Sequence, residues 1–417
     1  MDIRGTDIMK NFRNTAFAAF VAVLLVLSSC ARVAERVVPV DKPVGLTDPD
    51  TGLPLYYSSL DEAITPDVLT QQGGTCWAYA AVTAIDYAYQ YENGTSTGID
   101  PVELTEAIFD TGNEEGIFLD DDVDPLNAGG NGSMVMDILS RGYDGYFLTE
   151  SVEYEDADMT DIKNAIMEYG AVSANISAYE THFINTRGTT TFIADAYSGT
   201  DHDVVLVGWN DDFPADAFAV EASCDGAWLA QNSYGPYWGD GGYFWISYDT
   251  PFTQMRTYTL STDYSEALSY CAYATSYWQP DTTLVANHYP ESGTLEAVGT
   301  YIVDPDTDIT VTVYSEDLTE ELYTTTAHFD LPGYYTVELD DPLEVNGFFI
   351  AIDFGKSIPC EGRSTYRYDR NFVVTSEEGQ SYVFYRNEWI DVTESDRMRS
   401  LNTYDPVNNF FIVALMG

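Results

Sequence analysis

The sequence predicts an α+β fold: a helical half, then a β half, then an all-β region. Apolar residues recur at helical spacing after Cys76, apolar runs typical of strands begin at Ala171, and no helical periodicity follows about Ser261. With 417 residues, the chain is too long for one ordinary core. We therefore expect two domains after an N-terminal segment.

The longest predicted helix starts at Cys76. Small and apolar residues follow at helical spacing, and Gly94 marks the end of the pattern. Further helices are expected at residues 134–140 and 159–169, the second with Thr160 as its N-cap. The small residues after Cys76 predict close packing, so Cys76 should open a buried helix.

Strands are predicted in two groups. The first group forms the β half and comprises residues 172–176, 203–209, 227–232 and 243–248. The second group predicts an all-β sandwich of about 150 residues and comprises residues 309–313, 335–339, 348–354, 381–385 and 410–415. The helical and β halves should meet at a cleft, where ligands usually bind.

Cys76 is the candidate nucleophile. It follows a glycine-rich segment and opens a helix, where unpaired N–H groups and the helix dipole favour thiolate over thiol. Nucleophilic catalysis also needs a proton carrier and a group that orients this carrier. His202, at the head of an apolar strand, and Asn232 are the candidates for these roles. Cys76 and His202 are expected to form a thiolate–imidazolium pair.

The motifs around these residues resemble those of papain-like cysteine peptidases. QQGGTCWAYAA contains Cys76, DHDVVLVGW contains His202, and NSYG, which begins at Asn232, is followed by WGDGGY. Three motifs in this order are far more specific than a lone Cys or His. The resemblance implies a papain-like two-lobed fold, a helical lobe plus a β lobe, followed by the all-β sandwich domain. It also implies peptide-bond hydrolysis without a cofactor.

Two substrate-binding positions follow from the same resemblance. NAGGNG at residues 127–132 resembles the glycine strand with which the family pairs the substrate backbone. Gly130 would lie beside the bound peptide, because a residue without Cβ allows close approach; a turn glycine is the alternative. Thr200 is expected to line a specificity pocket.

The oxyanion hole departs from the family pattern. The family has a Gln six residues before the Cys, where this chain has Thr70. Gln71 is expected to supply the side-chain donor beside the Cys76 backbone N–H, with Gln72 as the alternative. Tyr234 replaces a Trp that shields the His–Asn hydrogen bond, and Tyr can serve the same purpose.

The N-terminus reads as a targeting segment. Basic residues precede a short apolar run within residues 1–30, and the run ends in LSSC, which resembles a bacterial lipobox. Cys30 would then carry lipid; an ordinary secretory signal is the alternative. Residues 31–52 are expected to form a tether. The protein should therefore be extracellular, anchored at the bacterial cell surface as a lipoprotein or otherwise secreted.

The expected domains are a peptidase domain at residues 53–262 and a β-sandwich at residues 263–417. The second resembles the lectin-like domain that follows papain-like peptidase domains in some bacterial surface proteins. The expected partners are a protein or peptide substrate and, through the second domain, a cell-surface glycan or wall component. A structural or spacer role for this domain is the alternative.

The composition is globular and strongly acidic. The chain has 68 acidic and 17 basic residues along its length, for a net charge of −51. This excludes nucleic-acid binding, which needs Lys and Arg to neutralise phosphates. Cys224, Cys271 and Cys360 are expected to be buried free thiols. Residues 120–122 and Asp124 have the oxygen-rich look of a calcium site without its regular spacing, and no metal is expected.

Together, these features predict an exported cysteine endopeptidase acting through Cys76, His202 and Asn232. One alternative is a surface adhesin whose peptidase cleft has decayed, which the departure at Thr70 leaves open. Another is a wall-peptide amidase or transglutaminase that uses the same Cys–His chemistry.

Overall fold

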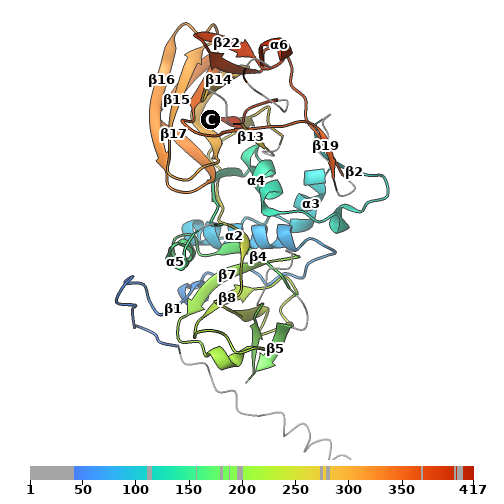
Figure 1. Ribbon diagram of the computed structural model, residues 1–417, viewed down its shortest axis with the longest axis vertical. Helices are drawn as coiled ribbons and strands as arrows, with labels where there is room; N and C mark the ends of the chain where they lie inside the picture. The colour runs from blue at the N-terminus through green and yellow to red at the C-terminus, as the bar shows by residue number, and fades with distance from the viewer. Residues whose placement is uncertain are drawn as a thin grey trace, which may run out of the picture.

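The computed structural model describes residues 42–109, 115–155, 157–178, 182–186, 188–194, 201–272, 276–278, 282–367, 370–398, 401 and 407–417. Figure 1 shows an eight-stranded sheet at one end, a helical layer around α2 in the middle, and a β-rich region with the C-terminus at the other end. The predicted fold class, a papain-like fold followed by a β-rich domain, is confirmed.

The helices agree with the predicted pattern, apart from two that the sequence did not reveal. Helix α2 ends where Gly94 adopts a left-handed conformation with φ of 70°, which favours glycine. Helices α3 and α6 were not predicted. The α-helices are α2 (Cys76–Asn93), α3 (Pro101–Phe109), α4 (Gly132–Ser140), α5 (Met159–Tyr169) and α6 (Ser395–Met398), with 3-10 helices η1 (Ser59–Glu62), η2 (Pro125–Asn127) and η4 (Ala215–Ala217).

The N-cap predicted for α5 is wrong. Asp158, not Thr160, precedes the helix, and its carboxylate accepts hydrogen bonds from the backbone N–H groups of Thr160 and Asp161. The Asp161 side chain accepts the N–H of Asp158 in return, which completes a capping box. Asp and Thr are both good N-caps, so the reciprocal contact with Asp161 fixes the start of the helix.

Replacing the observed cap should therefore cost more stability than replacing the predicted one. We expect Asp158→Ala to lower the free energy of unfolding by about 1 kcal/mol, because two N–H groups lose their acceptor. Thr160→Ala serves as the control and should change it by about 0.5 kcal/mol or less. Urea unfolding measures both, and equal losses would contradict the assignment of the cap.

The first large sheet carries the β half. Its order is β10-β4-β7-β8-β9-β6-β5, with β1 beside β7, and the four strands predicted here are confirmed. Helix α2 packs against β7, and the core between them contains Trp77, Ala78, Val205 and Val207. The strands are β1 (Tyr56–Ser58), β4 (Val172–Ile176), β5 (Phe183–Thr186), β6 (Thr189–Phe192), β7 (His202–Asn210), β8 (Ala227–Gln231), β9 (Tyr243–Ser247) and β10 (Thr253–Arg256).

The second large sheet has ten strands. Its strands β14 and β17 are paired along most of their length, with register shifts that bend the pair. Two separate strands, residues 335–339 and 348–354, were predicted where β17 is continuous, and β14 and β16 were not predicted. The sheet contains β3 (Phe147–Val152), β11 (Thr259–Ser261), β12 (Glu266–Leu268), β14 (Leu284–Ile302), β15 (Thr307–Ser315), β16 (Glu321–Phe329), β17 (Gly333–Asp353), β21 (Ser381–Tyr385), β22 (Glu388–Asp391) and β23 (Ile412–Met416).

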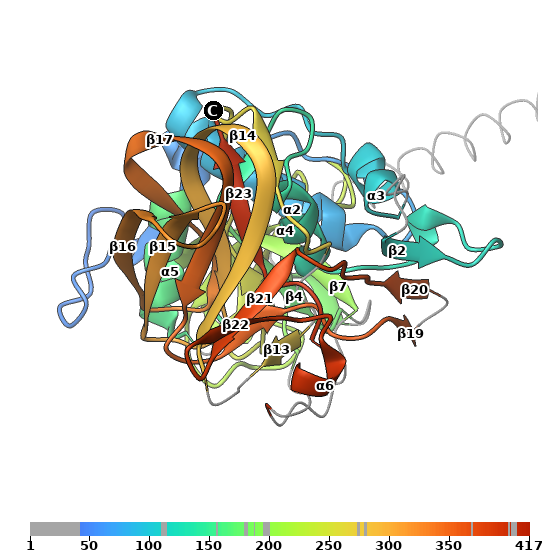
Figure 2. The ribbon, with the colours of Figure 1, turned by 90° about the horizontal axis from the view of Figure 1, so that it is seen from above.

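Strands link the two predicted domains. Strand β3, from the peptidase segment, pairs with β17 of the C-terminal segment. Strand β2 (Gly116–Leu119) likewise pairs with β20 (Arg370–Val373), which also pairs with β19 (Thr365–Arg367), and Figure 2 shows this small sheet projecting from one side. A further pair joins β13 (Ser276–Trp278) to β18 (Ile358–Cys360). The proposed boundary near residue 262 therefore divides the sequence but does not divide the sheets.

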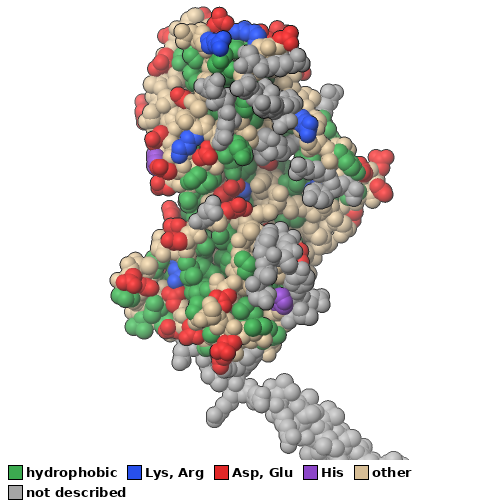
Figure 3. All heavy atoms as spheres, in the orientation of Figure 1, with side chains coloured by type: hydrophobic (Ala, Val, Ile, Leu, Met, Phe, Trp, Pro, Cys, Tyr) green, Lys and Arg blue, Asp and Glu red, His purple; other side chains and the backbone are tan. Residues whose placement is uncertain are grey.

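The surface agrees with the acidic composition. Figure 3 shows Asp and Glu side chains over both ends of the visible face, with few Lys or Arg. Cys271 and Cys360 are buried free thiols as expected, whereas Cys224 is exposed, so that prediction is wrong for Cys224. Within the described ranges, no helix is long and apolar enough to cross a membrane.

Candidate active site

Cys76 is the first residue of α2, as the sequence predicts. The helix is held in place by apolar burial: Ala78, Ala81 and Ala84 are each at most 1 % exposed. Small side chains on this face bring the helix backbone close to β7. Cys76 itself is only partly buried, so its thiol stands at the edge of this packed layer.

His202 and Asn232 lie together at the ends of neighbouring strands. His202 opens β7, Asn232 follows β8, and His202 Nε2 lies 2.8 Å from Asn232 Oδ1. The backbone N–H of Ser233 also donates to Asn232 Oδ1 at 2.8 Å, which identifies this atom as an acceptor. His202 Nε2 therefore carries a proton, and Nδ1 is the nitrogen free to accept one in the neutral ring.

Tyr234 covers this pair. Its ring stacks on that of His202 with the ring centroids 4.9 Å apart, and Trp238 packs edge-on against Tyr234. His202 and Asn232 are 4 % and 2 % exposed, respectively. Excluding water strengthens the hydrogen bond between them. The aromatic layer thus fixes one orientation of the imidazole.

Gln71 is tied to the same region. Its backbone N–H donates to the Ser233 carbonyl at 2.8 Å, and its Oε1 accepts from Ser233 Oγ at 2.6 Å. Its Nε2 donates to the Gly73 carbonyl, which leaves the second hydrogen of the amide for another acceptor. Gln72 instead is exposed, and its backbone carbonyl accepts from Thr75 Oγ1. Of the two glutamines, Gln71 is therefore the one whose side chain is anchored next to Asn232.

Gly130 packs against the residue that follows the nucleophile. A Cβ at Gly130 would lie 2.4 Å from the Trp77 ring, a distance that side chains do not tolerate. Both close packing on Trp77 and close approach of a substrate require a residue without a side chain. The observed contact accounts for the glycine by itself. The proposed role beside a bound peptide stays a prediction.

Asp203 is a site residue that the sequence analysis missed. It follows His202 on β7, is 8 % exposed, and its Oδ2 lies 3.9 Å from Cys76 Sγ. Asn175 on β4 lies directly opposite Asp203 in the sheet. A carboxylate at the head of the apolar run VVLVGW was the available signal, because acidic residues are seldom buried without a partner.

Burial dominates the electrostatics of the site. It raises the pKa of the Cys76 thiol to about 12, with a further rise from Asp203, while backbone N–H groups at the start of α2 lower it. It also lowers the pKa of His202, against the influence of Asn232 and Asp201. The predicted effect of the helix terminus is present but outweighed. Both shifts act against the expected ion pair of Cys76 and His202, which stays a prediction.

Asp203 should make stability depend on pH. Burial raises the pKa of its carboxyl from 3.8 to about 7, so the folded protein pays for ionising it as the pH rises through this window. Asp203→Asn should raise the free energy of unfolding by a few kcal/mol at pH 8 and by about 1 kcal/mol or less at pH 4. Urea unfolding at both pH values measures the difference.

A control comes from the exposed carboxylate on the other side of His202. Asp201 accepts the backbone N–H of Ala178, and Asn can make the same bond. Asp201→Asn should therefore leave stability nearly unchanged at both pH values. A gain for Asp203→Asn that did not vary with pH would contradict the buried, ionisable state of Asp203.

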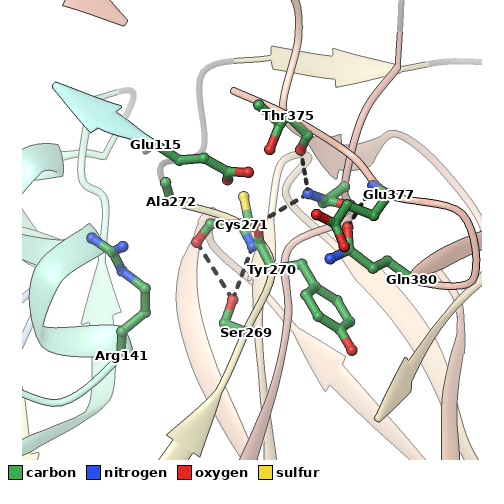
Figure 4. Close-up of a pocket in the computed structure, with 10 residues that line it drawn as sticks. Glu115, Arg141, Ser269, Tyr270, Cys271, Ala272, Thr375, Glu377 and Gln380 are labelled. Carbon is green, nitrogen blue, oxygen red and sulfur yellow. Dashed lines mark hydrogen bonds between the residues drawn. The ribbon is translucent and has the colours of Figure 1, made fainter. Parts of the chain in front are cut away.

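A separate cavity lies between the helical layer and the β-rich region. It has a volume of about 330 Å³ and includes Arg141, Cys271 and Glu377 in its lining (Figure 4). Asn409 donates to the carbonyls of Tyr270 and Thr375 there, so internal hydrogen bonds already satisfy its amide. This cavity lies between the two parts of the chain, and no residue of the candidate site lines it.

The acidic run gives no metal centre. Over the part of the chain that the structure covers, no group of three or more His, Cys, Asp or Glu could hold a metal ion. Asp124 instead caps η2 by accepting the N–H of Leu126. Thr200 and Cys30, predicted to bind substrate and to carry lipid, lie outside the described residues.

Comparisons with protein families agree with this fold. Residues 140–262 match the family model of papain family cysteine protease, and residues 265–403 match that of a lectin like domain. Residues 140–262 are therefore similar to papain family cysteine proteases, and residues 265–403 are similar to lectin-like domains. Both matches agree with the resemblance seen in the motifs.

The chain is also similar to curated proteins and to solved structures. The chain is 25 % identical over 202 residues to the senescence-specific cysteine protease SAG12 of Arabidopsis thaliana, covering 45 % of this chain and 54 % of that protein. It is 26 % identical over 193 residues to the oryzain beta chain of Oryza sativa subsp. japonica, covering 43 % and 39 %. The chain thus spans about half the length of these curated relatives, or less.

Two structures of the clostridial cysteine protease Cwp84 share the fold. One, of the enzyme after propeptide cleavage, has a TM-score of 0.70 at 19 % identity and covers 86 % of this chain and 98 % of that one. The other contains the cysteine protease and lectin-like domains of Cwp84, a surface layer associated protein of Clostridium difficile. It has a TM-score of 0.72 at 18 % identity and covers 90 % of each chain.

Proposed function

We propose that this protein is an exported cysteine endopeptidase in which Cys76 is the nucleophile, His202 the general base and acid, and Asn232 the group that orients His202. The observation that carries the proposal is the His202–Asn232 hydrogen bond at the strand end beside Cys76. An imidazole held with Nε2 protonated has only Nδ1 to accept the proton of a nucleophile.

Hydrolysis then proceeds through an acyl-enzyme. Cys76 Sγ attacks the carbonyl carbon while His202 accepts the thiol proton, and the carbonyl oxygen gains negative charge. The C–N bond breaks as His202 gives the proton to the leaving amine, which leaves a thioester. Water attacks the thioester, with His202 as base, and releases the carboxylic acid and the Cys76 thiol.

Gln71 supplies the second donor to the oxyanion in this proposal. Its amide keeps one free hydrogen and is anchored through Ser233, next to Asn232. The Cys76 backbone N–H, at the unpaired start of α2, is the first donor.

We further propose that the protein acts at the bacterial cell surface as a lipoprotein anchored through Cys30. The apolar run before LSSC supports export. A cell-surface glycan or wall component is the proposed partner of residues 263–417, and Gly130 and Thr200 the proposed contacts with the peptide.

The nucleophile can be tested by labelling with a thiol-directed epoxide. Cys76→Ala should abolish both labelling and peptide hydrolysis, because no other thiol has an adjacent base in this proposal. Cys224→Ala is the matched control: it removes an exposed thiol and should leave labelling and hydrolysis intact. Mass spectrometry of labelled peptides, with circular dichroism to check folding, gives the result. Label on Cys224 alone would refute the role of Cys76.

The two glutamines test the oxyanion hole. Gln71→Ala should lower kcat by about 10²-fold or more, with little change in KM, because the lost donor acts on the transition state. Gln72→Ala should lower kcat far less, since Gln72 is exposed and lacks the anchor to Ser233 that holds Gln71. Steady-state hydrolysis of a fluorogenic peptide measures both, and a larger effect at Gln72 would reverse the assignment.

A further inference from the structure

Three polar side chains form a row across the first sheet beside Cys76. Asp203 on β7 lies opposite Asn175 on β4, and Asn175 lies opposite Thr253 on β10. Directly opposed residues of antiparallel strands point to the same face. Val205 and Val207, two and four positions after Asp203, belong to the core around α2. The row therefore lies on the face that α2 covers, at the end where the nucleophile stands.

Two polar atoms of the row are buried without a hydrogen-bond partner. Asn175 is 6 % exposed, and its Oδ1 accepts no hydrogen bond; Thr253 Oγ1 is also buried without a partner. These two atoms lose their hydration without a compensating bond, which costs free energy. Asp203 accepts from the Cys76 thiol, but among the described residues no Lys or Arg forms an ion pair with it.

The cation on the same strand as Thr253 has partners of its own. Arg256 forms an ion pair with Glu153, and its Nη2 also donates to Ser133 Oγ at 3.2 Å. Within the part of the chain that the structure describes, Asp203 therefore has no cationic partner.

We propose that Asp203 and Asn175 select substrates with an arginine side chain near the scissile bond. A guanidinium carries five donors in a planar fork, enough for a carboxylate and a neighbouring amide oxygen. A peptide bound at Cys76 comes within reach, because Asp203 Oδ2 lies 3.9 Å from the sulfur. A lysine would satisfy fewer acceptors, and an acidic side chain would be repelled. This inference rests on the proposed peptidase function.

The charge of the whole protein favours the same substrates. A net charge of −51 attracts cationic peptides and repels anionic ones before any contact forms. Steering of this kind weakens with salt, whereas recognition by a buried carboxylate does so much less. Selectivity that persists at high salt would therefore come from Asp203 and not from the surface.

The test compares peptides that contain arginine with isosteric peptides that contain citrulline, which has the same shape without the charge. Each of the four positions on either side of the scissile bond is varied in turn, at high salt. The wild type should cleave the arginine peptide with at least ~10-fold higher kcat/KM at one position. Asp203→Asn should reduce this ratio to near one, and Asp201→Asn, the matched control, should keep it.

A binding measurement separates this inference from the proposed function. In Cys76→Ala, fluorescence anisotropy should show the same preference for arginine over citrulline without turnover. Equal hydrolysis of both peptides by the wild type would overturn the inference and leave the peptidase function standing. A ratio unchanged in Asp203→Asn with native circular dichroism would also overturn it. If the wild type neither takes the epoxide label nor cleaves any peptide, the peptidase function fails and the inference with it.

Discussion

The packing of α2 against β7 is the constraint on which the candidate site depends. Cys76 belongs to the helix, whereas His202 and Asp203 belong to the strand, and they are more than a hundred residues apart in sequence. The alanine-rich face of the helix allows the two backbones to approach closely. A larger side chain on this face would push α2 away from β7. Cys76 would then lose its contact with Asp203, although no residue of the site itself had been substituted.

The same burial that assembles the site also sets its charge states. It raises the pKa of the Cys76 thiol and of the Asp203 carboxyl and lowers that of His202, so each group is pushed toward its neutral form. In the proposed mechanism, charge appears only during the reaction, when His202 accepts a proton from Cys76. Donors fixed in advance, such as the N–H groups at the start of α2, become most useful at that moment.

Local patterns were enough to predict much of the fold and part of the site. Helical spacing and Gly94 marked α2, apolar runs marked β4, β7, β8 and β9, and ordered motifs drew attention to Cys76, His202 and Asn232. The contact of Asp203 with Cys76 was missed because it depends on tertiary packing. The cap of α5 is local: Asp161 follows Asp158 by three residues and can return its bond, whereas Lys163, three residues after Thr160, has no acceptor atom in its side chain. In β17, the turn-like residues Asp340, Asp341 and Pro342 mark a shift of register, where they have no partner on β14, and not the end of the strand.

The pairing of β3 with β17 has a consequence for how the chain folds during synthesis. Strand β3 lies between β11 of its own segment and β17, which is synthesised nearly two hundred residues later. Until β17 emerges, one side of β3 presents unpaired N–H and C=O groups, an edge to which other strands can add. A peptidase made without its C-terminal partner would keep that edge permanently. The C-terminal segment thus completes a sheet that begins in the segment before it.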